Sequence, residues 1–299
     1  MKALKQIGEF GMIERIAKKI KCDKSVICGI GDDAAVISYT KDKYLLFTTD
    51  MLVEGVHFRR KDATFAQIGR KALAVNISDI AAMGGVPKYA VVSLGFPKGL
   101  SLRSVDEIMR GMYALAKEFG INIVGGDTVR AEKIILCVSL AGEVKVRNLT
   151  LRSGAKPGDL IFVTGTLGDS RRLKQFNFIP RVKEAQRIIE RFRPTALIDI
   201  SDGLVSDLQR ITEQSRVGAI IFEQSIPTSR GASLKKALYE GEDFELLFTM
   251  SLDSARKFYS KDKFPITCIG KIVERKRGLT LIDKEARTSS LKQRGFKHF

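Results

Sequence analysis

The spacing of apolar and polar positions divides the chain into short elements of alternating type. Apolar residues recur every third or fourth position in some segments, as in helices, and form short runs in others, as in strands. For the first half these patterns predict, in order, a helix over 2–21, hairpin strands over 35–38 and 43–47, a helix through 83 with Thr64 as its N-cap, a strand over 89–95, a helix over 102–119, a short strand from 122 that ends in the glycines 125–126 and Asp127, and a strand over 133–146. We therefore expect an α+β layer in which helices cover one face of a sheet.

A segment rich in Arg, Ser, Gly and Pro, residues 147–159, predicts a boundary between two domains. We expect an N-terminal domain over residues 1–147 and a C-terminal α/β domain over residues 148–299. For the C-terminal domain the pattern predicts strands over 160–164 and 196–199, helices over 180–192 and 205–215, a strand over 246–250, and hairpin strands over 267–273 and 279–282.

The helix predicted over 64–83 is apolar on nearly all sides between Ala72 and Ala82, so we expect it to be buried. It nevertheless carries Asn76 and Asp79, one turn apart on one face. A buried carboxylate without a partner is costly, so Asp79 needs a cation or hydrogen-bond donors. One interpretation is a structural pairing with a lysine or a loop, and the other is a metal site.

Two acidic clusters flank the predicted hairpin, with Asp32 and Asp33 before it and Asp50 after it. The turn at 40–42 should bring them close together, and neighbouring carboxylates repel one another unless a cation or a shared proton intervenes. Asp199 and Asp202 add two acids at the end of a predicted strand, which is more than a helix cap requires. This pattern favours a metal site.

The proportions of hydrophobic residues, 44%, and of charged residues, 28%, are ordinary, but the net charge of +17 is unusual. Strong positive charge indicates polyanionic partners, or a basic surface without a specific role. The basic residues are spread along the chain, and no aromatic residues alternate with them as in base-stacking segments. Nucleic-acid binding is therefore the minority hypothesis.

Other classes are disfavoured by what the chain lacks. The four cysteines have no C-x-x-C spacing, which argues against a disulfide scaffold or a zinc site. No apolar run approaches the about 20 residues that span a bilayer, and no secretory signal pattern is present, so we expect a cytoplasmic protein. His57 and His298 do not accompany a nucleophile motif, so covalent hydrolysis is not expected.

Eight motifs occur in a fixed order between residues 31 and 246. They are GDDAA at 31–35, TTDMLVEGVHF at 48–58, KALAVNISDIAAMG at 71–84, GGDT at 125–128, RSGAKPGD at 152–159, TGTLGD at 164–169, IDISDGL at 198–204 and GEDFEL at 241–246. In this set the sequence resembles the thiamine-monophosphate kinases, a family of the aminoimidazole-ribonucleotide synthetase superfamily, and the match runs from GEFG at 8–11 to GFKHF at 295–299. The resemblance implies a two-domain α+β fold with an N-terminal domain that binds ATP and magnesium and dimerises through its sheet.

The resemblance also implies an activity and a set of site residues. The activity is direct in-line transfer of the ATP γ-phosphate to thiamine monophosphate, with several Mg²⁺ ions and no general base, because the attacking phosphate oxygen is already ionised. The implied magnesium ligands are Asp33, Thr48, Thr49, Asp50, Asp79, Asp127, Asp199 and Asp202. The implied ATP contacts are Gly126, Arg152 and Ser201, and the implied substrate contacts are His57, Glu242 and Phe296. The implied partners are ATP, thiamine monophosphate and a second copy of the chain, with neither nucleic acid nor membrane.

The alternatives remain distinct. Another ATP-dependent enzyme of the superfamily would share the acidic motifs, whereas a basic nucleic-acid-binding protein would explain the charge of +17 without them. For single residues, His57 has a structural histidine as its alternative, and Phe296 has a core anchor.

Overall fold

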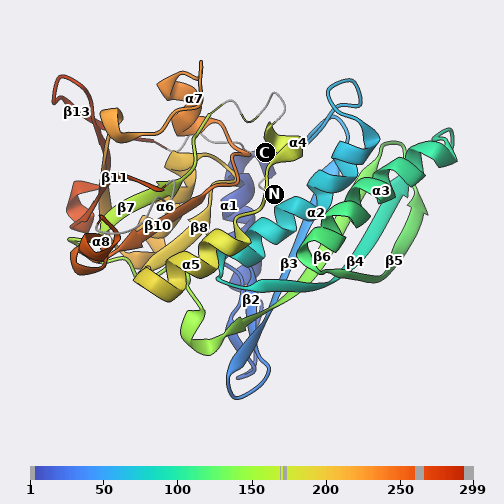
Figure 1. Cartoon of the computed structure of the whole chain (residues 1–299), viewed down its shortest axis with the longest axis horizontal. Coiled ribbons are helices and arrows are strands. Elements are labelled where there is room, and N and C mark those ends of the chain that lie inside the picture. The colour runs from blue at the N-terminus through green and yellow to red at the C-terminus, as the bar shows by residue number, and fades with distance from the viewer. Residues whose placement is uncertain (1–3, 169, 171–173, 260–265, 293–299) are drawn as a thin grey trace.

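The computed structural model describes residues 4–168, 170, 174–259 and 266–292 (Figure 1). A six-stranded sheet forms the N-terminal part, in the order β1-β2-β3-β6-β4-β5. Neighbouring strands are antiparallel except β4 and β5, which are parallel. The strands are β1 (Val26–Cys28), β2 (Ala35–Ser38), β3 (Lys43–Val53), β4 (Val86–Phe96), β5 (Asn122–Arg130) and β6 (Ile135–Lys145).

Helices α2 (Phe65–Ala82) and α3 (Leu102–Phe119) cover one face of this sheet, as predicted (Figure 1). Buried and exposed side chains accordingly alternate along β3, where Leu46 and Leu52 are buried on the face that the helices cover. Phe47 and Met51 point to the opposite face and are 43% and 53% exposed. That face of the sheet therefore presents apolar side chains to the surroundings.

A seven-stranded sheet forms the C-terminal part, in the order β13-β12-β9-β11-β7-β10-β8. Its strands are β7 (Leu160–Thr164), β8 (Ala196–Asp199), β9 (Gly218–Phe222), β10 (Leu246–Met250), β11 (Ile266–Val273), β12 (Leu279–Ile282) and β13 (Thr288–Ser290). The helices of this part are α4 (Gln175–Asn177), α5 (Val182–Phe192), α6 (Leu204–Ser215), α7 (Leu234–Tyr239) and α8 (Leu252–Tyr259). The α+β architecture with two sheets is thus confirmed. Among the residues described, no helix has the length and apolar character that crossing a membrane requires.

Helix α2 lies between the two parts and packs against both of them (Figure 1). It begins after Thr64, whose side chain forms a capping box with Gln67, so the predicted N-cap is confirmed. The core around α2 continues into the C-terminal sheet through Phe162 and Phe248. Because apolar contacts run across residues 147 and 148, the division into two domains at that point stays a prediction.

Helix α1 (Leu4–Ala17) is shorter than predicted, and Gly8 interrupts it with a left-handed φ of 64°. The helix ends four residues before the predicted end at 21. The apolar periodicity therefore located the helix but not its bounds.

The predicted hairpin of β11 with β12 is wrong, because β9 lies between them. Gly270 of β11 pairs with Ile221 of β9, and Leu279 of β12 pairs in parallel with Ala219 of β9. Strands that are adjacent in sequence usually pair, but here the short apolar strand β9 lies between β12 and β11. The sequence pattern did not predict β9 as a strand.

The predicted end of the fifth strand at the glycines is also wrong. Strand β5 continues to Arg130 because it pairs with β4 over eight positions from Tyr89↔Asn122 to Phe96↔Arg130. A Cβ at Gly126 would lie 1.8 Å from the carbonyl oxygen of Val92, so glycine is required by this close approach. Asp127 consequently sits within a strand and not at its end.

Candidate active site

A cavity of about 1150 Å³ lies between the N-terminal sheet, α2 and the loops of the C-terminal sheet. Both parts of the chain contribute polar side chains to it. The predicted site residues that line it are Asp33, Thr48, Thr49, Asp50, His57, Asp79, Arg152, Ser201, Asp202 and Glu242. The structure therefore brings together most of the set that the sequence indicated.

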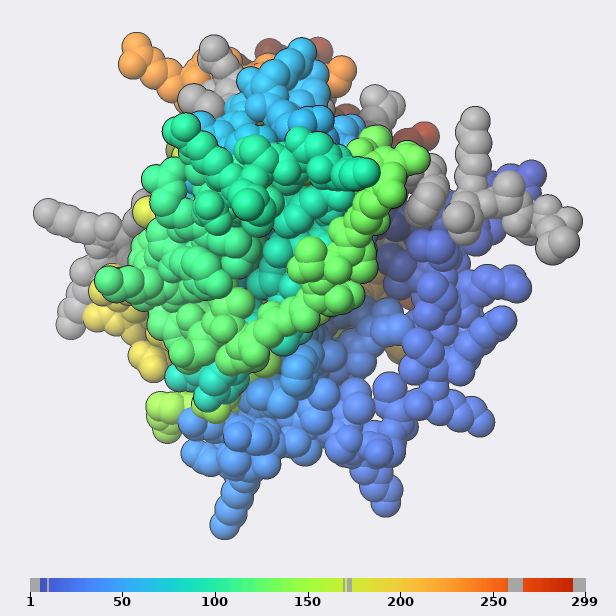
Figure 2. Space-filling model, turned by 90° about the vertical axis from the view of Figure 1, so that its right-hand side faces the viewer, coloured from blue at the N-terminus to red at the C-terminus, as the bar shows by residue number. Residues whose placement is uncertain are grey.

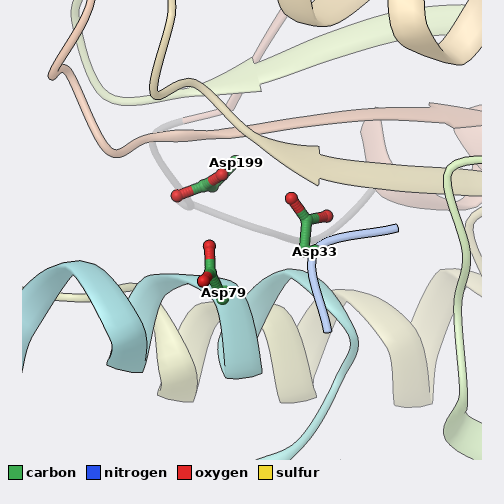
Figure 3. Close-up of side chains that lie close together, drawn as sticks. All are labelled: Asp33, Asp79 and Asp199. Atoms are coloured by element: carbon green, nitrogen blue, oxygen red, sulfur yellow. The ribbon is translucent and has the colours of Figure 1, made fainter. Parts of the chain in front are cut away.

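Three aspartates from separate elements meet beside this cavity (Figure 3). Asp33 precedes β2, Asp79 lies on α2 and Asp199 ends β8. Each offers one carboxylate oxygen, and these oxygens lie within 4.8 Å of one another. This spacing suits a shared cation, since oxygen ligands surround Mg²⁺ and Ca²⁺ at 2.0–2.6 Å, a range typical of such ions.

The donors around these three carboxylates are few. The hydroxyl of Thr48 donates to Asp79 Oδ2 at 2.5 Å, and the hydroxyl of Ser78 donates to Asp199 Oδ2 at 2.5 Å. Arg152 Nη2 donates to Asp33 Oδ1 at 2.5 Å.

Two buried carboxylate oxygens of this group, Asp33 Oδ2 and Asp199 Oδ1, have no hydrogen-bond partner among the described residues. Leaving buried acceptors unpaired is costly. A hard cation would meet both oxygens, so the residues present fit Mg²⁺.

The electrostatics agree with that fit. Burial, followed by the charges of Asp202 and Asp33, raises the pKa of Asp50 to about 6. Burial is also the first cause that raises the pKa of Asp79 and of Asp199, and neighbouring carboxylates add to it. The protein by itself therefore disfavours the charged form of these acids, and a bound cation would reverse that preference.

Asp202, like Asp33, has an arginine partner. Arg210 pairs with Asp202 and, at 2.5 Å, with Asp207, which is fully buried on α6. Sequence reasoning missed both Arg210 and Asp207. Their spacing of three residues on one helix was the available signal.

Thr49 faces away from Thr48 and Asp50, because side chains alternate along β3. Its hydroxyl lies on the exposed face of the sheet, 3.2 Å from the carbonyl oxygen of Val138. A ligand role for Thr49 stays a prediction.

Gly126 and Asp127 do not line the cavity of the single chain. They lie on the edge strand β5, which β6 and β4 separate from β3. Figure 2 looks onto the molecule from the side of α3 and β5. Asp127 lies opposite Ser93 of β4, Ser93 lies opposite Cys137 of β6, and Cys137 lies opposite Met51 of β3. Side chains that lie opposite one another share a face, and Met51 shares its face with Thr49, so Asp127 lies on the same face of the sheet as Thr49.

The predicted acceptor end lies around His57 and Glu242. His57 Nδ1 accepts a hydrogen bond from the backbone N–H of Val53 at 3.0 Å. Glu242 pairs with Lys71, a fully buried lysine of α2. Sequence reasoning missed Lys71, although a lysine in a helix that is apolar on nearly all sides was a usable signal. Phe296 lies outside the described residues.

Comparison with known proteins places this fold and site in a class. The family model described as AIR synthase related protein, N-terminal domain, matches residues 31–144. Residues 31–144 thus match an AIR synthase-related N-terminal domain, in agreement with the superfamily that the motifs suggested.

Full-length relatives are more specific. The thiamine-monophosphate kinase of Bacillus subtilis (strain 168) is 36% identical over 326 residues, covering 98% of this chain and 100% of that protein. The thiamine-monophosphate kinase of Aquifex aeolicus (strain VF5) is 35% identical over 324 residues, covering 99% of each. A solved structure described as AaThiL complexed with AMPPCP and TMP matches with a TM-score of 0.88 and 32% identity, covering 100% of this chain and 99% of that one. The chain belongs to the thiamine-monophosphate kinase family.

Proposed function

We propose that the protein transfers the γ-phosphate of ATP to the phosphate of thiamine monophosphate, forming thiamine diphosphate and ADP. The observation that carries this proposal is the pair of buried oxygens on Asp33 and Asp199, beside Asp79, that find no hydrogen-bond partner in the part of the chain that the structure describes. An all-oxygen cluster of this kind fits the divalent cations that polyphosphate transfer requires. The names of the relatives and the AMPPCP and TMP of the neighbouring structure support the choice of substrates.

The proposed magnesium ligands from the N-terminal part are Asp33, Thr48, Asp50 and Asp79, and those from the C-terminal part are Asp199 and Asp202. When bound, Mg²⁺ would neutralise charge on the reacting phosphates. The chain's own side chains hold the two parts of the site in place: Arg152 fixes Asp33, and the hydroxyls of Thr48 and Ser78 orient Asp79 and Asp199. No side chain is needed as a general base, because the acceptor oxygen carries its own negative charge.

We assign the proposed substrate contacts to two groups of residues. Arg152 and Ser201 are the proposed ATP contacts, together with Gly126. His57 and Glu242 are the proposed contacts to thiamine monophosphate, together with Phe296. The burial of Asp33 and Asp199 would help to keep water from the transferred phosphate.

A homodimer is the second part of the proposal. Phe47, Met51 and Val91 are 43–53% exposed on the uncovered face of the N-terminal sheet, and pairing two subunits there would remove apolar surface from water. Thr49 and Asp127 lie on the same face, so such a dimer would carry both predicted ligands to the subunit interface. A monomeric mass in sedimentation at micromolar concentration would contradict this arrangement.

We place the enzyme in the cytoplasm. The described cysteines Cys22, Cys28, Cys137 and Cys268 are all free thiols, which suits a reducing compartment where ATP is available. A tagged protein that fractionates outside the cytoplasm would contradict this placement.

The activity is tested by incubating the purified protein with ATP, Mg²⁺ and thiamine monophosphate, and by separating thiamine diphosphate chromatographically. We expect product only when all three are present, and none when thiamine replaces thiamine monophosphate. Absence of product with folded protein would overturn the proposal. Steeply salt-dependent binding of DNA or RNA that ignores Mg²⁺ and ATP would favour the nucleic-acid alternative instead.

A further inference from the structure

Lys71 is the unexpected residue of α2, because its charged side chain is fully buried, whereas the other buried residues of this helix are apolar apart from Asn76 and Ser78. Burial lowers the pKa of Lys71, and the charge and hydrogen bond of Glu242 oppose that shift. Lysine is rarely buried without a paired charge. The position therefore calls for an explanation from its contacts.

The ammonium group of Lys71 has three oxygen partners from three separate segments. It donates to the backbone carbonyl of His57 at 3.0 Å, to Gln175 Oε1 at 2.7 Å and to Glu242 Oε1. It also lies 5.1 Å from the centre of the Phe176 ring, within range of a cation–π interaction. The lysine thus joins the loop after β3, the start of α4 and the loop before β10.

Glu242 is the partner of Lys71 whose charged group reaches the cavity. Its side chain is 27% exposed and lines the cavity, whereas its backbone has a left-handed φ of 68°. The backbone N–H of Glu242 donates to the carbonyl of Ser201 at 2.7 Å, which anchors the loop but not the carboxylate. The ion pair with Lys71 is the interaction that directs the carboxylate.

We propose that Lys71 is a positioning residue for the acceptor substrate, because it fixes Glu242 and the His57 loop, which line the cavity. This inference rests on the proposed function, in which those two residues contact thiamine monophosphate. It extends that function by separating the two substrates: Lys71 controls the acceptor contacts and has no contact with the aspartates of the phosphate-transfer site. The loss of Lys71 should therefore weaken acceptor binding selectively.

Arg70 supplies a matched control on the same helix. Its guanidinium donates to the carbonyl oxygens of Phe176 and Phe178, at 3.3 and 2.6 Å, so it also links α2 to the segment around α4. Within the described part of the chain, its hydrogen bonds go to this segment and not to His57 or Glu242, and it does not line the cavity. A general weakening of the link between α2 and α4 would therefore affect Arg70→Met and Lys71→Met alike.

The experiment compares the KM for thiamine monophosphate and the KM for ATP in wild type, Lys71→Met and Arg70→Met. We expect Lys71→Met to raise the KM for thiamine monophosphate at least tenfold, with the KM for ATP within twofold of wild type. Arg70→Met should leave both KM values within twofold. Lys71→Gln, which keeps an N–H donor, should raise the KM for thiamine monophosphate by a smaller factor.

The outcomes separate the two proposals. A wild-type protein without kinase activity contradicts the proposed function itself. An active wild type with Lys71 variants that behave like Arg70→Met, or that raise both KM values equally, overturns the positioning role. Thermal melting shows whether the variants fold. If neither Lys71→Met nor Lys71→Gln folds, the positioning role is overturned as well, because the lysine would then serve the fold alone.

Discussion

The chain buries two groups of carboxylates and neutralises them in different ways. Asp33, Asp79 and Asp199 form the first group, here called the open cluster. Asp243 and Glu245, in the loop before β10, form the second, here called the paired cluster. Both groups lie at junctions between elements distant in sequence, so their different treatment reflects their roles and not their depth.

The paired cluster receives its counter-charges from the protein. Arg181 donates through Nε and Nη2 to the two oxygens of Glu245, at 2.8 and 2.9 Å. Lys174 lies 3.5 Å from Asp243, which also accepts the backbone N–H of Gly168 at 3.0 Å. Burial alone would raise the pKa of Glu245, but the hydrogen bonds and charge of Arg181 outweigh it and lower that pKa.

The open cluster has fewer donors and leaves two buried oxygens without partners among the described residues. Burial is likewise the first influence on Asp79, but neighbouring carboxylates reinforce it and raise the pKa. A carboxylate that the protein neutralises is part of the scaffold, as around Arg181. A carboxylate that the protein leaves short of positive charge indicates a ligand that brings the charge with it.

The largest expected effect comes from removing one charge from each cluster. Asp79→Asn should lower kcat at least 1000-fold, about 4 kcal/mol of transition-state stabilisation, without lowering the melting temperature of the metal-free protein. Glu245→Gln should lower the free energy of unfolding by about 2 kcal/mol, because it removes the buried carboxylate charge that pairs with Arg181 and Lys174. Activity assays and urea unfolding of both variants give the measurement.

A loss of stability without a loss of activity in the open cluster would contradict the distinction between the two clusters. If Asp79→Asn unfolds the protein while turnover per folded molecule is retained, the open cluster is structural. Asp50 lies near Asp79 in the cavity, so Asp50→Asn provides a second variant for the same test.

A second prediction concerns added metal. Mg²⁺ at about 100 times its dissociation constant should stabilise the wild type by about 2.7 kcal/mol, since it binds the folded state alone. Asp79→Asn should lose most of that gain, whereas Glu245→Gln should keep it despite its lower starting stability. Urea unfolding with Mg²⁺ and with EDTA measures both differences, and an equal gain in the two variants would place the metal elsewhere.

The smallest effect is the pH dependence of the metal-free protein. The folded pKa of Asp50 is raised to about 6, so its contribution to stability is full below the unfolded pKa near 4 and is lost as the pH rises through 6. Between pH 7 and pH 5 this group should add about 1 kcal/mol. Glu245, whose folded pKa is lowered, loses its contribution only as the pH falls below about 4.5.

Urea unfolding in EDTA at the two pH values, for wild type and Asp50→Asn, isolates that contribution. The stability difference between the two proteins should shift in favour of wild type at pH 5. A difference that stays constant from pH 7 to pH 5 would show that Asp50 does not change protonation on unfolding in that range.

Local patterns predicted several elements well. Thr64 and Gln67 form the predicted cap of α2, and α2 is buried as its apolar sequence required. Strand β5 was misjudged because glycines that look like a turn are needed for the close approach of Gly126 to Val92. A turn and a tight strand contact both favour glycine, and the sequence does not distinguish them.

The candidate site was predicted in part. The aspartates could be proposed from residue type, from clustering and from the resemblance of the motifs. The opposite orientation of Thr49 follows from the alternation of side chains along β3, which continues to Val53 beyond the predicted end at 47. The place of Asp127 on an edge strand and the partners of Lys71 depend on strand pairing and loop packing, which residue spacing does not encode.

The sequence by itself determined which residues have the chemistry of a magnesium-polyphosphate site, and which helix is buried beneath it. Tertiary structure decided which carboxylates receive a cation from the protein: Arg181 reaches Glu245, whereas one oxygen of Asp199 has no hydrogen-bond partner among the residues that the structure describes. The physical reason is that charge compensation acts over a few ångströms, between side chains that only long-range folding brings together.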